Sequence, residues 1–349
     1  MDGITVEELQ LAARNHALPL EALREPITPV GLHYLLIHFD IPRVDAADWR
    51  LDIGGLVERP LSLGLDELKA RPARTLAVTL ECAGNGRALL EPRSLSQPWL
   101  LEAVGNSEWT GTPLAPLLRE AGLAPDAVDV VFTGLDRGIQ GGVEHLYERS
   151  LTVDDALQDD VLLAYAVNGE PLPPQHGYPL RLLVPGWYGM THVKWLRTIT
   201  VSGEPFGGWQ QEVAYRLRAS EDEAGAPVTR MLPRSLLVPP GFPEFLSRAR
   251  FVTAGPCPLE GRTWSGWAPI ERVEVSADGG ETWSDATLDD DASAYGWRGW
   301  QFAWDARPGE HELCCRATDA AGNTQPLDAA WNLDGYCNNA VQRVRVTVS

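Results

Sequence analysis

The chain has 349 residues, of which 44% are hydrophobic and 22% charged, and its formal net charge is −19 at pH 7. This length favours two domains, the composition is that of an ordinary globular protein, and the acidity argues against nucleic-acid and anionic-membrane partners. No segment stays apolar for the roughly 18 residues that a membrane-spanning helix needs, and the start lacks a signal-peptide pattern, so we expect a cytoplasmic protein.

Up to about residue 200, strand-like runs alternate with helical ones. The start of the chain, residues 1–23, is typical of a short polar helix. Strands are predicted at residues 51–56, 75–80, 128–135, 161–169 and 178–186, and helices at 62–70 and 112–123. In the second helix, Thr112 is a plausible N-cap before Pro113. The mixture predicts an α+β domain with a mixed sheet.

The strand at 75–80 runs into the sequence ECAGNGR at residues 81–87. A buried cysteine is most often only a small apolar residue. Gly84 and Gly86 permit a close approach to the backbone, and Arg87 would favour a thiolate if it turned back toward Cys82. Cys82 is therefore a candidate nucleophile or soft-metal ligand, with a core thiol as the alternative.

The five cysteines form no CxxC pair, and their number is odd. This spacing suggests neither a zinc site nor a disulfide framework, so reduced thiols are expected.

Two histidines, an arginine and a lysine lie close together in the chain: His176, Arg181, His192 and Lys194. Spaced by glycine turns, such a set could hold a phosphate or a carboxylate. A lone histidine in a turn is more often just a polar loop residue, and the residue types do not name a ligand.

Residues 202–245 are expected to form a connector, because turn and breaker residues are frequent there. After it, alternation with a period of two recurs at residues 249–255, 270–283, 297–304, 311–319 and 341–349. This pattern predicts an antiparallel sandwich of immunoglobulin type, without the antibody disulfide. Cys314 and Cys315 are expected to be inert neighbours on one strand, facing opposite sides.

Four segments occur together in an order that resembles the molybdopterin-dependent sulfite oxidase family. They are TLECAGNGR at 79–87, LLAYAVNGEPLPPQHGYPLRLLVPGWYGMTHVKWL at 162–196, IERVEVSADGGETW at 270–283 and WNLDGYCNNA at 331–340. The resemblance implies an α+β molybdopterin-binding domain, placed at 1–220, and an immunoglobulin-like β-sandwich that usually builds a homodimer, placed at 221–349. It also implies a molybdenum–molybdopterin cofactor and an external electron acceptor, and no haem domain is expected.

The resemblance also assigns roles to single residues. Cys82 matches the cysteine that binds molybdenum. The residues that match cofactor-binding positions are His38, Asp136, His176, Arg181, His192 and Lys194. The residues that match the substrate pocket are Arg87, Trp99 and the active-site tyrosine Tyr215.

Two positions depart from the family pattern, since Leu36 and Asp334 stand where the family has substrate-binding arginines. A dianion such as sulfite should then bind poorly, because each charge close to the site matters by a few kcal/mol at an effective dielectric constant of about 20. One alternative is that a local insertion misaligns one of the two positions with the family pattern. Another is that a different arginine takes over, and the candidates are Arg50, Arg93 and Arg216.

The implied activity is two-electron oxygen-atom transfer at a cysteine-ligated molybdenum centre, on sulfite or a related small sulfur or nitrogen oxo compound. Leu36 and Asp334 motivate an alternative, the oxidation or reduction of a less charged sulfoxide or N-oxide. A non-catalytic scaffold that has lost the cofactor is a further alternative, and a cysteine hydrolase with Cys82 as nucleophile is another.

Overall fold

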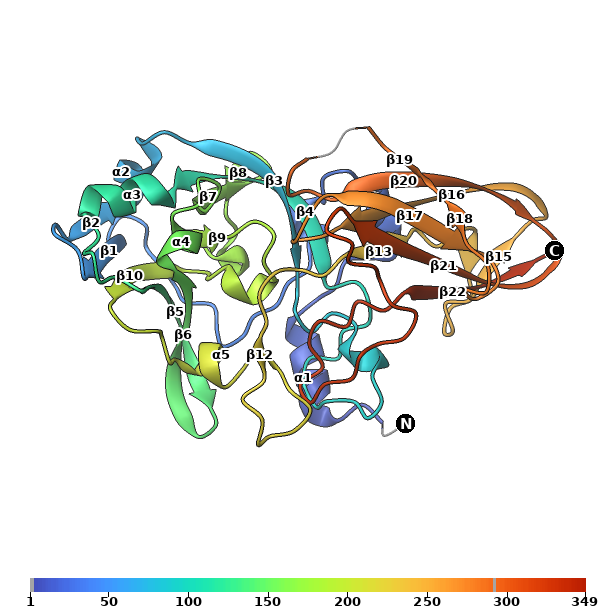
Figure 1. The fold of residues 1–349 in the computed structure, drawn as a ribbon, viewed down its shortest axis with the longest axis horizontal. Coiled ribbons are helices and arrows are strands. Elements are labelled where there is room, and N and C mark those ends of the chain that lie inside the picture. Colours follow the sequence, from blue (N-terminus) through green and yellow to red (C-terminus); the bar gives the residue numbers. More distant parts are fainter. Residues whose placement is uncertain (1–2, 291–292) are drawn as a thin grey trace.

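The computed structural model describes residues 3–290 and 293–349. Figure 1 shows two lobes side by side, a mixed helix–sheet domain that contains β1 to β10 and an all-β domain that contains β13 to β22. The predicted fold, an α+β domain followed by a β-sandwich, is confirmed. None of the helices described here combines the length and the apolar character needed to cross a membrane.

The α+β domain contains two mixed or antiparallel sheets and short helices. The first sheet has the order β2 (Leu61–Gly64), β1 (Arg50–Gly55), β10 (Leu196–Ser202), β5 (Asp129–Gln140) and β6 (Val143–Thr152), with β1 and β10 parallel. The second has β3 (Arg74–Glu81), β4 (Val104–Pro113), β7 (Leu162–Val167) and β8 (Glu170–Pro171), and β9 (Arg181–Leu183) also pairs with β7. The helices are α1 (Val6–Arg14), α2 (Leu65–Lys69), α3 (Leu114–Ala121), α4 (Val153–Ala156) and α5 (Trp209–Glu212). Short 3₁₀ turns lie at Leu20–Arg24, Val30–Leu32, Arg87–Leu89, Pro174–His176 and Gly189–Thr191.

The two predicted helices of this domain are shorter than expected. Residues 61–64 form β2, so only the second half of the predicted segment 62–70 is helical. In α3 the buried leucines and alanines recur at helical spacing, which packs one face of the helix against the core. The N-cap is Pro113 and not Thr112, because the Thr112 hydroxyl donates instead to the Leu68 carbonyl at 2.8 Å.

The all-β domain is a sandwich of two sheets. One sheet has the order β13 (Arg234–Leu237), β16 (Gly255–Trp264), β20 (Arg298–Ala306) and β19 (Thr287–Leu288). The other has β14 (Phe242–Pro243), β15 (Arg250–Val252), β22 (Gln342–Val348), β21 (Gly309–Asp319), β17 (Ile270–Ser276) and β18 (Ser284–Asp285). A small ribbon of β11 (Arg216–Leu217) and β12 (Ala226–Pro227) precedes them.

One part of the sequence prediction for this domain needs correction. The expected connector at 202–245 contains β13, which pairs with β16 as part of the sandwich. All five cysteines are free, as expected. On β21, Cys315 packs in the core between the sheets, and Cys314 is buried outside that core cluster.

The two domains meet at the end of β3. Thr79 donates its backbone N–H to the Tyr295 carbonyl at 2.9 Å, and Ala83 packs in one hydrophobic cluster with Trp264 and Trp297 of the all-β domain. The segment that carries Cys82 is therefore enclosed between the two domains.

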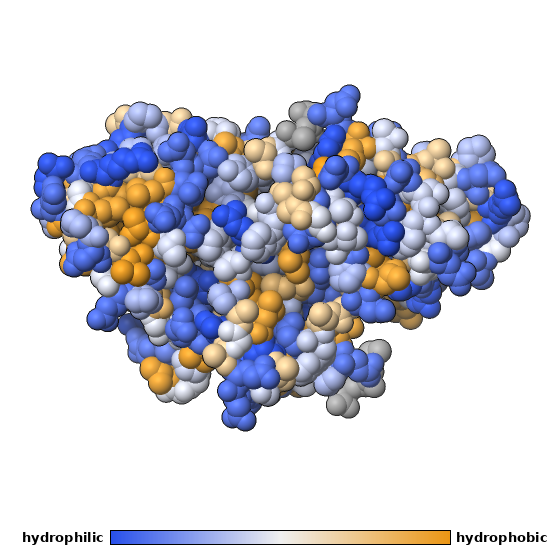
Figure 2. All heavy atoms as spheres, in the orientation of Figure 1, coloured by the Kyte–Doolittle hydropathy of each residue, from blue (hydrophilic) through white to orange (hydrophobic). Residues whose placement is uncertain are grey.

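Hydrophilic residues cover most of the face shown in Figure 2, and a patch of hydrophobic residues lies on the lobe that contains α3 and β10.

Candidate functional site

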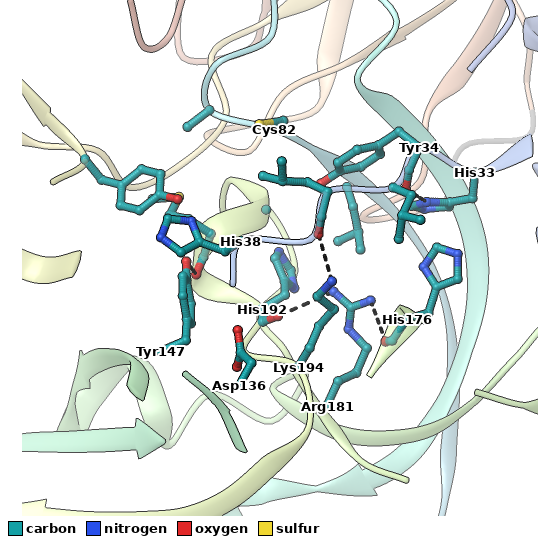
Figure 3. Close-up of a pocket in the computed structure, with 17 residues that line it drawn as sticks. His33, Tyr34, His38, Cys82, Asp136, Tyr147, His176, Arg181, His192 and Lys194 are labelled. Carbon is teal, nitrogen blue, oxygen red and sulfur yellow. Dashed lines mark hydrogen bonds between the residues drawn. The ribbon is translucent and has the colours of Figure 1, made fainter. Parts of the chain in front are cut away.

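A cavity of about 70 Å³ lies in the α+β domain, below the loop that follows β3 (Figure 3). Its walls come from residues 33–38, from the loop after β3, from β5 and β6, and from residues 176–194. The predicted site residues that line it are His38, Cys82, Asp136, His176, Arg181, His192, Lys194 and Tyr215, and Leu36 lines it as well. The polar lining residues that the sequence analysis missed are His33, Tyr34 and Tyr147.

Cys82 lies on the cavity wall opposite the cationic residues in Figure 3. Its backbone N–H donates to the Ala103 carbonyl at 2.9 Å, which ties the start of the loop to the next strand. Burial raises the pKa of the Cys82 thiol, although Arg87, the Gly84 backbone N–H and Trp99 each lower it. The thiol is therefore protonated in this environment, and a metal that replaces the proton would supply the charge that stabilises the thiolate.

Arg87 and Trp99 surround Cys82 without lining the cavity. Arg87 is 5% exposed, and its guanidinium lies 5.0 Å from the centre of the Tyr336 ring. Its Nε donates to the Asp334 carbonyl at 2.8 Å. The structure thus places Arg87 behind the cysteine, where it acts on the thiol through its charge.

The buried Arg181 and the half-buried Lys194 form the floor of the cavity. Lys194 Nζ donates to the Leu36 carbonyl at 2.7 Å and to the Gln175 carbonyl at 3.1 Å. Arg181 stacks over Trp109 at 4.7 Å. Burial lowers the pKa of Arg181 to about 10 and that of Lys194 to about 7, because a charged group loses solvation in this environment.

Several polar atoms around these cations have no hydrogen-bond partner among the residues that the structure describes. They are Asp136 Oδ1, Arg181 Nε and His33 Nε2. Burial raises the pKa of Asp136 to about 7, and the charge of Lys194 opposes that rise. Buried polar groups of this kind are normally satisfied, so a cavity with two cations and one weakly acidic carboxyl favours a polar, anionic ligand.

His192 contributes a wall to the cavity but no free nitrogen. The Val184 backbone N–H donates to His192 Nδ1 at 3.1 Å, and His192 Nε2 lies 3.1 Å from the Trp187 carbonyl. These two contacts place the proton on Nε2 and occupy both ring nitrogens. His38 differs, since among the residues that the structure describes only its Nε2 has a partner, Gln140 Oε1 at 3.1 Å.

Three buried histidines and the partly buried His38 make the protein sensitive to acid at this site. Burial lowers the pKa of His33 to about 4, of His176 to about 2 and of His192 to about 3, and it lowers that of His38 as well. Below about pH 6.5 the unfolded chain binds protons that the native state does not. The free energy of unfolding should therefore fall as pH drops through 6.5, by up to about 1.4 kcal/mol per pH unit for each histidine.

Urea unfolding of the wild type and of His33→Gln between pH 7.5 and 5.5 tests this expectation. The variant should lose stability less steeply than the wild type, by the contribution of one histidine. Equal slopes for the two proteins would contradict the assignment of a neutral, buried His33.

Leu36 and Asp334, which stand where the family has arginines, lie in different surroundings in the structure. Leu36 lines the cavity, and its backbone carbonyl accepts a hydrogen bond from Lys194. The Asp334 carboxylate instead pairs with Arg218 at 3.2 Å. The negative charge that Asp334 adds is therefore opposed by the guanidinium of Arg218.

None of the three proposed substitute arginines reaches the cavity. Arg50 pairs with Glu67, Arg93 with Glu8 and Arg216 with Glu212.

An arginine that the sequence analysis missed lies behind the tyrosine of the site. Arg149 is 2% exposed, and its guanidinium lies 5.7 Å from the Tyr215 ring. Tyr147 and Arg149 are two positions apart on β6, so the period-two pattern of a strand could have placed them on one face. Tyr215 itself has a positive φ of 57°, a backbone conformation that is costly for a tyrosine and concentrates at functional sites.

Known proteins match both domains. Residues 38–210 match the model of the oxidoreductase molybdopterin binding domain, and residues 231–349 match that of the Mo-co oxidoreductase dimerisation domain. Mitochondrial sulfite oxidase of Homo sapiens is 36% identical, over 95% of this chain and 64% of its own length. An NADH nitrate reductase of Brassica napus is 33% identical over 92% of this chain, which spans only 38% of that protein. The sulfane dehydrogenase SoxCD of Paracoccus pantotrophus superposes with a TM-score of 0.83 at 29% identity, covering 95% of this chain and 86% of that one.

Proposed function

Because the chain belongs to the sulfite oxidase family of molybdopterin-dependent oxidoreductases, we propose that it catalyses two-electron oxygen-atom transfer at a molybdenum ion held by Cys82. The observation that carries the proposal is the position of the Cys82 thiol and of the Arg181 and Lys194 cations on the walls of one cavity. A thiolate suits a soft metal, and fixed cationic donors suit a phosphate. When bound, the cofactor supplies the redox chemistry, and the protein supplies binding, orientation and electrostatics.

The donor set of the cavity fits the pterin part of such a cofactor. Lys194 has three N–H donors, of which two are used by backbone carbonyls, so one remains for a phosphate. Arg181 Nε is likewise unpartnered among the described residues. Asp136 Oδ1 and His38 would bind polar edges of the cofactor, while His192 shapes the wall on which it rests.

The substrate that we propose is sulfite or a related small sulfur or nitrogen oxo compound. The similar proteins carry names that point to sulfite, nitrate and sulfane sulfur. Arg87 and Arg149 supply positive charge near Cys82 and Tyr215, which favours an anion or a polar oxygen. Leu36 supports a second candidate, a less charged sulfoxide or N-oxide, because this apolar residue lines the cavity at a position where the family pattern has an arginine.

Metal and pterin content of protein from a host that makes the cofactor tests the proposal. About one molybdenum ion and one pterin per chain are expected, together with turnover in an assay that compares sulfite with a panel of sulfoxides and N-oxides. Protein that carries neither molybdenum nor pterin would support a scaffold that has lost the cofactor. Inactivation by iodoacetamide without a change in metal content would support a cysteine hydrolase.

The match of residues 231–349 to a dimerisation domain supports a homodimer as the assembly. A mass of two chains in sedimentation is the expected result. An external electron acceptor and a cytoplasmic location stay predictions from the sequence.

A further inference from the structure

The loop that carries Cys82 is held from the side away from the cavity by a buried ion pair between the two domains. β3 ends at Glu81, and successive residues of an extended segment point to opposite sides. Cys82 lines the cavity, whereas the Glu81 carboxylate meets β13 of the all-β domain. There Glu81 Oε1 lies 2.7 Å from Arg234 Nε, and both side chains are 1% exposed.

The other contacts of the Glu81 carboxylate come from both domains. Trp264 on β16 donates its indole N–H to Glu81 Oε2 at 2.9 Å. Asn85, inside the loop itself, donates its amide N–H to Glu81 Oε1 at 3.0 Å. One carboxylate therefore joins the end of β3, a residue in the middle of the loop and two strands of the other domain.

Arg234 connects the same pair to the far end of the loop. It donates to the Asn338 carbonyl, and the Asn338 side chain donates to the Gly86 carbonyl at 2.8 Å. The Cys337 backbone N–H donates to the Ala83 carbonyl at 2.8 Å. Gly86 has a φ of +89°, and a Cβ added there would lie 2.9 Å from the Asn338 amide nitrogen, so this approach requires glycine.

We propose that the Glu81–Arg234 pair is a positioning device through which the all-β domain fixes the direction of the Cys82 thiol. The inference rests on the proposed role of Cys82 as a metal ligand, and it gives the C-terminal domain a task at the site beside assembly. The two buried charges neutralise each other, and Trp264, Asn85 and Asn338 add hydrogen bonds around them. Moving one member of the pair would therefore leave an uncompensated buried charge. Groups behind a ligand orient it and tune its affinity for metal.

The variant that tests this inference is Glu81→Gln with Arg234→Met, which removes both charges and leaves neither one buried alone. The matched control is Arg250→Met, because Arg250 also joins the two domains, through Glu21 at 2.6 Å, and is 4% exposed. The readout is the rate of Cys82 alkylation by iodoacetamide, followed by peptide mapping, in full-length protein from a host that cannot make the pterin. We expect a rate about tenfold or more above wild type in the double variant, because a loosened loop opens more often. The control should stay within about twofold of wild type.

A second measurement uses the loaded protein. The Mo(V) electron paramagnetic resonance spectrum should shift or broaden in the double variant and stay unchanged in Arg250→Met. If the double variant does not fold, Arg234→Lys takes its place, since lysine keeps the charge but loses the planar fork that reaches two partners. About threefold faster alkylation is then expected.

Alkylation at the wild-type rate in a folded double variant, or in folded Arg234→Lys, overturns the inference. Wild-type protein without molybdenum would overturn the proposed function only. The alkylation rates in cofactor-free protein would still decide whether the ion pair holds the loop.

Discussion

Cys82→Ser is expected to lower oxygen-atom transfer by at least about a hundredfold while the pterin content stays near that of the wild type. Removal of a partner behind a metal ligand typically costs 10- to 100-fold, so loss of the ligand itself should cost at least as much. A serine oxygen is a hard donor, and soft thiolates are what a metal of this kind prefers. The pterin should remain because Arg181 and Lys194 line a different wall of the cavity and keep their backbone contacts.

Activity with the substrate panel, together with molybdenum and pterin analysis of the same samples, checks this prediction. Cys314→Ser is the matched control, since Cys314 is also buried but lies on β21 of the other domain. It should retain wild-type activity. Activity of Cys82→Ser within a few-fold of wild type would remove Cys82 from the metal site.

Local sequence pattern predicted strands that have runs of buried apolar residues, such as β3 and β7, and it failed where tertiary pairing decides. β16 contains Pro256 and Pro258, which argue against a strand. In the fold, however, β13 pairs only with residues 261–264 of β16, so both prolines lie on an edge that needs no N–H donor on that side. β6 was missed because its residues are polar, and only its pairing with β5 makes it a strand.

The candidate site was predictable in its residue types and not in their roles. The sequence brought out Cys82 and the later cations because they lie in specific motifs that resemble a known family. It could not show that His192 has both ring nitrogens engaged, since that depends on the backbone of residues 184–187. It could not pair Glu81 with Arg234 either, because the two lie on strands of different domains.

Leu36→Arg should strengthen sulfite binding, with a KM about tenfold lower at moderate salt. Leu36 lines the cavity, so a guanidinium there would add positive charge close to the reacting centre. At an effective dielectric constant of about 20, two charges a few ångströms apart interact by a few kcal/mol. Repulsion from Lys194 and solvent screening reduce this gain to about 1.4 kcal/mol, which corresponds to a factor of about ten. The Lys194 contact with residue 36 should survive, since it uses the backbone carbonyl.

The variant Asp334→Arg tests whether the lower sulfite KM expected for Leu36→Arg depends on the position of the new arginine or only on the added positive charge. Asp334 pairs with Arg218 and supports Arg87 through its backbone carbonyl, so an arginine there would face two cations and lose the ion pair. We therefore expect Asp334→Arg to leave the sulfite KM unchanged or to raise it, and the double variant to gain nothing over Leu36→Arg. Steady-state kinetics with sulfite and with a neutral sulfoxide measure this directly, because only the anion should respond to Leu36→Arg. The wild-type sulfite KM could already be low and not respond to Leu36→Arg. That result would mean that Arg87 and Arg149 provide enough positive charge to bind the anion. The proposal of a less charged sulfoxide or N-oxide substrate would then be contradicted.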